Sequence, residues 1–139
     1  MIPKISRTAR QLMAIDSHLR VWRTIVGTSE KAYCMGLYTS AVKMNSEQAF
    51  RFLSDAHDTI EEVQSKMGVA LNYILETAGT NGKEYGTGLE KVNVVKRCVT
   101  AVFDLWEAVA EAEEEHPAPL EETFARQGFK FQAWEEQGL

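Results

Sequence analysis

Proline is scarce in this chain, and where it occurs it lies close to the two ends. The 139 residues contain three prolines, Pro3, Pro117 and Pro119. Because proline removes a backbone donor and breaks helices, its absence from residues 4–116 leaves that stretch free to form long helices. The same stretch has no convincing strand pattern. The sequence therefore predicts an all-α fold.

The chain also lacks any apolar run that could cross a bilayer. Such a span needs roughly 20 consecutive apolar residues. The basic start MIPKISRTAR is not followed by the apolar block of a signal peptide. Hydrophobic residues at 45% and charged residues at 25% are typical of soluble globular proteins. We therefore expect one domain in the cytoplasm, with no membrane contact.

Residues that bind metal ions are few. Cys34 and Cys98 each lie inside an apolar helical pattern, which favours reduced core thiols over a disulfide or a ligand pair. A Glu-x-x-His spacing, typical of dimetal carboxylate bundles, occurs once at residues 113–116, beside Pro117 where a helix must end. We predict no metal site and no cofactor.

Basic residues are rare at the C-terminal end, although the net charge is only −5. Residues 1–25 hold five basic residues against one acidic residue, whereas residues 105–139 hold nine glutamates against two basic residues. Binding along a phosphate backbone needs a concentrated positive surface, so nucleic acid is disfavoured as a partner. We expect a partner protein with a basic surface, steered by the acidic residues 111–122.

Periodicity and capping residues predict four main helices, at about residues 4–26, 29–44, 46–77 and 88–115. Gly27 ends the first helix, and the later helices start at capping residues, namely Thr28, Ser29, Asn45 with Gln48, and Thr87 with Glu90. Between the last two helices, GTNGKEYGTG (79–88) has four glycines in ten residues and predicts a flexible loop. We expect residues 1–116 to form an antiparallel bundle of these four helices, followed by a short helical or extended C-terminal tail at 117–139.

The stretch RFLSDAHDTIEE (51–62) places most of its charges on the solvent side of the third helix. Arg51 with Asp55, and Glu62 with Lys66, are four residues apart, the spacing of surface ion pairs. His57 and Glu61 are also four apart but lie near the edge of the apolar stripe. They are therefore a candidate acid/base pair.

Arg51 and His57, with five residues between them, resemble the arginine–histidine pair of the helical ribonuclease domains shared by higher eukaryotes and prokaryotes. Phe52 stands where those domains commonly carry a polar residue. The resemblance implies an RNA-acting bundle with Arg51 and His57 in catalytic roles. Arg51, His57 and Glu61 are thus the candidate catalytic residues.

The fourth helix is apolar over most of its circumference. A first seam runs through valines and Trp106, and a second runs through Val94, Cys98, Ala101 and Leu105. A helix of this kind must be covered on more than one side. It is either the central helix of a compact monomer or a helix whose second seam is left for self-association in a homodimer.

The C-terminal tail is rich in aromatic residues. Phe124, Phe129, Phe131 and Trp134 lie in a polar, glycine-interrupted segment that follows the acidic Glu113 and Glu114. The aromatic side chains either fold back as a lid over the bundle or anchor a partner, because large aromatics dominate binding energy when they fill pockets.

These residues favour a binding protein over an enzyme. We predict a non-enzymatic protein–protein interaction module, of the class of small bacterial or phage-encoded regulators, adaptors and inhibitors, that docks through apolar helical and aromatic surfaces. The alternative is an RNA-acting protein, either ribonuclease-like or nucleic-acid-binding.

Overall fold

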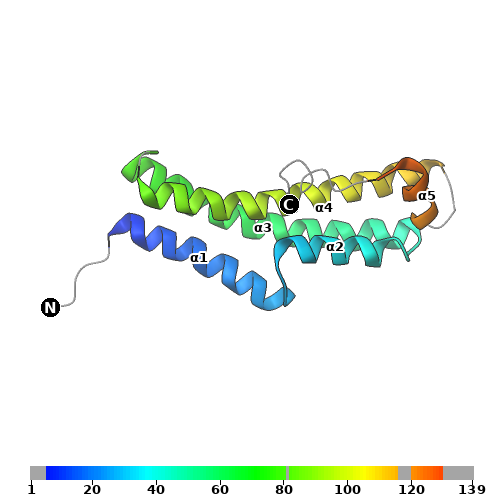
Figure 1. Cartoon of the computed structure of the whole chain (residues 1–139), viewed down its shortest axis with the longest axis horizontal. Helices are drawn as coiled ribbons and strands as arrows, with labels where there is room; N and C mark the ends of the chain where they lie inside the picture. The colour runs from blue at the N-terminus through cyan, green and yellow to red at the C-terminus, as the bar shows by residue number, and fades with distance from the viewer. Residues whose placement is uncertain (1–5, 81, 116–119, 130–139) are drawn as a thin grey trace. The chain divides into compact units, whose positions relative to one another are not determined.

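The computed structural model describes residues 6–80, 82–115 and 120–129, and every regular element in this part of the chain is a helix (Figure 1). The helices are α1 (Arg7–Val26), α2 (Glu30–Ala41), α3 (Ser46–Ala78), α4 (Lys83–Glu115) and α5 (Leu120–Gln127). The predicted all-α helical bundle is confirmed. Among these described helices, none has both the length and the apolar character needed to cross a membrane.

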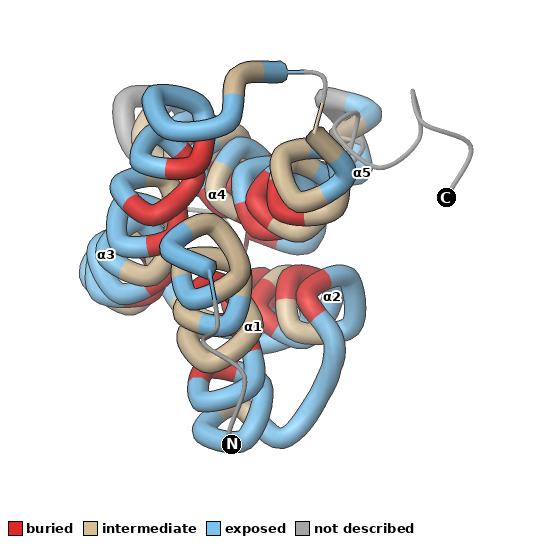
Figure 2. Tube along the Cα trace, turned by 90° about the vertical axis from the view of Figure 1, so that its left-hand side faces the viewer, coloured by how far each residue is buried: buried red, intermediate tan, exposed pale blue. Residues whose placement is uncertain are grey.

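The long helices α3 and α4 each take part in two packing units. Unit 1 comprises residues 1–28 and 61–96, and unit 2 comprises residues 29–60 and 97–139. In unit 1, α1 packs with the C-terminal half of α3 and the N-terminal half of α4. In unit 2, α2 and α5 pack with the other two halves. Figure 2 shows that buried positions follow one side of each helix, as amphipathic periodicity requires.

Helix α1 begins three residues later than predicted, after the cap Ser6, and ends before Gly27 as predicted. The Ser6 hydroxyl accepts a hydrogen bond of 3.1 Å from the Ala9 N–H. Gly27 has a φ of 74°, and its N–H donates to the Arg23 carbonyl at 2.8 Å. The side chains of Ile15 and Leu19 are buried, and their spacing of four residues places them on one side of the helix.

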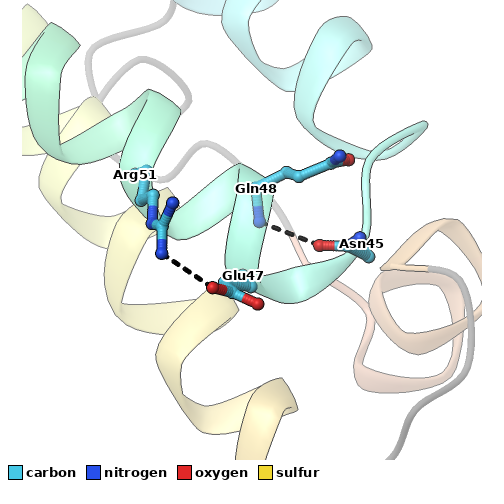
Figure 3. Close-up of polar contacts among 4 residues, drawn as sticks. All are labelled: Asn45, Glu47, Gln48 and Arg51. Atoms are coloured by element: carbon cyan, nitrogen blue, oxygen red, sulfur yellow. Dashed lines mark hydrogen bonds and ion pairs between the residues drawn. The ribbon is translucent and has the colours of Figure 1, made fainter.

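The next two helix starts also follow the predicted caps. The Ser29 hydroxyl accepts from the Ala32 N–H at 3.4 Å, at the start of α2. At the start of α3, the Asn45 side-chain oxygen accepts from the Gln48 N–H at 2.9 Å (Figure 3). Each bond satisfies a backbone donor that has no partner within the first turn of the helix.

The start of α4 differs from the prediction. Glycine content predicts a loop through residue 88 and a cap at Thr87, whereas α4 begins at Lys83, so this prediction is wrong. Of the predicted loop, Gly79 has the turn conformation that ends α3, with a φ of 73° and an N–H that donates to the Leu75 carbonyl. The connection between the two long helices is therefore much shorter than the glycine-rich segment.

Gly88 explains why α4 tolerates a glycine that looked like part of a loop. The residue is buried, and a Cβ added there would lie 3.1 Å from Cδ1 of both Ile15 and Leu71. Ile15 belongs to α1 and Leu71 to α3, so three helices of unit 1 meet at this position. The glycine allows close approach of helices and is not there to supply loop flexibility.

We expect Gly88→Leu to lower the free energy of unfolding by about 2–3 kcal/mol, because the new side chain must enter space that Ile15 and Leu71 fill. Gly86→Ala is the matched control on the same helix, since Gly86 is exposed and has nothing within 4 Å of an added Cβ. This control should gain about 0.5–1 kcal/mol from helix propensity. Urea denaturation measures both. Equal changes in the two variants would contradict the packing role of Gly88.

Candidate functional site

The candidate catalytic residue Arg51 is held on the outer side of α3. Its guanidinium donates to the Glu47 carboxylate at 2.8 Å, and its side chain is 77% exposed (Figure 3). The predicted pair with Asp55 is therefore corrected to one with Glu47. Both acids are four residues away, but a glutamate on the N-terminal side of the cation gives the better geometry along a helix. The predicted Glu62–Lys66 pair is confirmed, at 3.2 Å.

His57 lies on a different side of α3, against aromatic rings from α4. Its ring centroid is 5.8 Å from that of Phe103 and 5.7 Å from that of Trp106, and its side chain is 14% exposed. Six residues turn an α-helix by about 240°, so Arg51 and His57 cannot share a face. Glu61 is exposed and belongs to unit 1. The structure therefore does not bring Arg51 and His57 together as a catalytic pair.

The aromatic rings around His57 form what we call the aromatic surface of unit 2, made of Phe50, His57, Phe103 and Trp106. The centroid of Trp106 lies 5.2 Å from that of Phe50 and 6.1 Å from that of Phe103. Phe103 is 43% exposed. The Trp106 indole N–H is buried and makes no hydrogen bond to the residues that the structure describes. A buried donor without an acceptor raises the free energy of the isolated chain.

Charge is divided unequally between the two units. The residues of unit 2 include fourteen acidic against six basic residues, a net charge of −8, and those of unit 1 include six acidic against nine basic residues, a net charge of +3. Within unit 2, two exposed acidic residues are sequence neighbours of the aromatic surface: Asp58 follows His57, and Glu107 follows Trp106. The aromatic surface thus belongs to the unit with the negative formal charge.

Helix α1 carries a second exposed apolar feature, which we call the outer row. Met13, Val21 and Ile25 are 56%, 53% and 76% exposed and, with Ser17 between them, follow one another at steps of four residues. Each step of four residues turns the helix by about 40°, so the row curves round the exposed side of α1 from Met13 to Ile25. Exposed arginines occur on the same helix, at Arg10 and Arg20.

The seam predicted for self-association is covered by the chain itself. In α4, Cys98, Ala101 and Leu105 are each no more than 1% exposed. Val94 is half-buried. Of the other seam, Val92, Val95, Val102 and Val109 are buried, whereas Val99 and Trp106 are half-buried. Cys98, Ala101 and Leu105 are thus covered by the chain itself, and the predicted dimer seam is corrected at these three positions.

The C-terminal tail contributes a short helix to unit 2. Phe124 on α5 is 1% exposed, and its ring centroid lies 5.8 Å from that of Tyr38 and 5.2 Å from that of Phe129. Phe129 also stacks on Tyr38, at 5.7 Å. These two phenylalanines fold back on α2, which is the lid arrangement of the two that the sequence left open. The other predicted partner-binding positions, Phe131, Trp134 and the side chains of Glu113 and Glu114, lie outside the described residues.

A pair of cysteines occupies the core of unit 2. The sulfur atoms of Cys34 and Cys98 are 2.8 Å apart, and both residues are free thiols with exposures of 1% and 0%. The Cys34 sulfur is 3.7 Å from the carbonyl oxygen of Cys98, and the Cys98 sulfur is 3.7 Å from that of Glu30. The prediction that both cysteines are core residues is confirmed. Their pairing across α2 and α4 was not predicted.

The surroundings of this pair oppose ionisation. The hydrogen bond to Cys34 raises the pKa of the Cys98 thiol far above its usual value, and burial raises it further. Burial also raises the pKa of the neighbouring Tyr33, and the charge that the two sulfurs would carry as thiolates adds to this rise. At neutral pH the Cys98 sulfur is therefore a thiol.

Sequence reasoning missed the two surface features and the contact between the cysteines. Phe50 and Phe103 were not predicted as functional residues. Phe50 lies seven positions before His57 and Phe103 lies three positions before Trp106, and both spacings place the two residues on one side of a helix. Met13, Val21 and Ile25 are apolar residues of α1 that do not share the helical spacing of its buried residues Ile15, Leu19 and Trp22, and this was the available signal. Compared with protein-family models, curated proteins and solved structures, the chain matches none.

Proposed function

We propose that this chain is a non-enzymatic protein–protein interaction module that docks through the aromatic surface of unit 2. The observation that carries the proposal is Phe103, which is 43% exposed although it packs against His57 and Trp106. Aromatic side chains held by their neighbours lose little conformational entropy when a partner covers them.

The net charge of unit 2 indicates which kind of partner would dock there. Unit 2 has a net charge of −8, so a docking segment should be basic as well as apolar. The outer row of α1 has both properties, because exposed Met13, Val21 and Ile25 share the helix with four arginines. We therefore propose a second copy of the chain as the occupant, with the outer row of one copy on the aromatic surface of the other. Pairing of two outer rows would be opposed by repulsion between the arginines.

Self-association is the direct test. In sedimentation equilibrium, wild-type chain should form a complex of two copies, and Ile25→Glu or Phe103→Glu should each weaken it by about tenfold or more, since each places a charge in an apolar contact. Met35→Glu is the control, because Met35 is an exposed apolar residue of α2, 45% exposed, outside both surfaces. Association should also weaken as salt screens the opposite charges.

Mixing the two weakened variants separates this arrangement from others. The Ile25→Glu chain retains an intact aromatic surface, and the Phe103→Glu chain retains an intact outer row. A mixture should therefore associate more strongly than either variant alone. Wild-type chain that stays monomeric over a wide concentration range, or a mixture no better than its components, would contradict the proposal.

Within this proposal the chain acts as a regulator, adaptor or inhibitor, not as a catalyst. The residues that suggested catalysis, Arg51 and His57, lie on different faces of α3. We also propose the cytoplasm as its location, supported by two buried thiols in the reduced form.

A further inference from the structure

The two cysteines of unit 2 come from helices far apart in the sequence. Cys34 lies on α2 and Cys98 on α4, separated by 64 positions, and their sulfur atoms are 2.8 Å apart. A disulfide bond has a length of about 2.05 Å, so bond formation needs the sulfurs to approach by less than 1 Å.

We propose that Cys34 and Cys98 are a redox-active dithiol that closes reversibly to an intrachain disulfide. The bond would link α2 to α4 inside unit 2. This inference is independent of the proposed docking function, because neither cysteine belongs to the aromatic surface or to the outer row.

A small peroxide is the oxidant class that suits a buried pair. The thiolate of one cysteine attacks a peroxide oxygen and becomes a sulfenic acid, while the O–O bond breaks and the other oxygen leaves as water after taking up a proton. The second thiol then attacks the sulfenic sulfur, the S–S bond forms, and a second water leaves. The two sulfurs together lose two electrons and two protons, and hydrogen peroxide is reduced to two waters.

Both steps require access to a core that excludes solvent. Exposures of 1% and 0% mean that peroxide reaches the sulfurs only when unit 2 opens locally. The thiol form of Cys98 is also the weaker nucleophile, so the reaction is slow. The pair is therefore suited to respond to sustained oxidation, and a dithiol reductant reverses the change by exchange.

The geometry favours a disulfide over a metal site. Zinc–thiolate bonds are about 2.3 Å long, so a metal bound to sulfurs 2.8 Å apart would need an S–metal–S angle of about 75°, well below the tetrahedral value. Among the residues that the structure describes, no cluster of three His, Cys, Asp or Glu side chains could complete a coordination shell.

The test uses the folded full-length chain and hydrogen peroxide. After treatment, the chain is denatured and alkylated with N-ethylmaleimide. The expected product carries no adduct, has lost two hydrogens in mass, and yields one peptide pair that links Cys34 to Cys98. The melting temperature should rise by about 10 °C, because a bridge across a loop of this length restricts the unfolded chain. Dithiothreitol should restore two adducts and the original melting temperature.

Cys34→Ser and Cys98→Ser are the matched controls, and neither should gain stability on treatment. Peroxide-treated wild-type chain that still takes up two adducts, under conditions where the chain unfolded in guanidinium forms the bridge, would overturn the proposal. So would a bridge that lowers the melting temperature, since it would then distort unit 2 instead of linking its helices.

Discussion

Replacing Phe124 with alanine is expected to lower the free energy of unfolding by about 3 kcal/mol. The ring is 1% exposed and packs on Tyr38 and Phe129, so the substitution removes a large buried side chain and leaves a cavity between α5 and α2. The expected loss is at the low end of the range for this substitution, because a helix of eight residues can shift to fill part of the cavity. Chemical denaturation followed by circular dichroism measures the change.

Ala125→Ser is the control for Phe124→Ala. Ala125 is the next residue on α5 and is exposed, so its substitution should change stability by less than about 0.5 kcal/mol. The comparison separates the two roles that the sequence left open for the tail aromatics. A Phe124→Ala chain with full stability and lost binding would mean that the ring is an anchor for a partner after all.

Replacing Leu105 with alanine should likewise cost about 3 kcal/mol, within the range for fully buried leucines. Leu105 is 0% exposed on α4, where it was predicted to form a dimer seam. Because the chain itself covers this side chain, the loss should be independent of protein concentration. Denaturation at several concentrations, together with sedimentation of the folded variant, measures both quantities.

Glu107→Ala is the control for Leu105→Ala. Glu107 is exposed on the same helix, and its removal should change stability by no more than about 0.5 kcal/mol. A Leu105→Ala chain that loses stability only at low concentration, or that turns a stable dimer into a stable monomer, would restore the seam interpretation.

Local rules predicted the helices well because the signals act over one turn. The caps at Ser29 and Asn45 and the stop at Gly27 each involve residues three or four positions apart, and all three are present in the structure. The same local rules failed at Gly88. Its role depends on Ile15 and Leu71, which lie on other helices, and glycine content cannot tell a loop from a close helix contact.

The candidate site was less predictable than the fold for the same reason. Cys34 and Cys98 were each recognised as core residues from their apolar surroundings, yet their contact at 2.8 Å depends on how α2 and α4 pack. Arg51 and His57 were predicted to act as a pair because of their spacing along the sequence. The turn of the helix places them on different faces. Phe103 became a candidate binding residue only because the structure places its ring beside those of His57 and Trp106.

The amino-acid order by itself determined that this chain is helical, where most helices begin and end, and which side of each is apolar. Those properties follow from hydrogen bonds and side-chain periods within a few residues. Only the tertiary structure decided which apolar faces the chain covers, which it leaves exposed on α1, and how charge is divided between the units. These depend on contacts between residues dozens of positions apart, and such contacts are set by packing of whole helices and not by any local pattern.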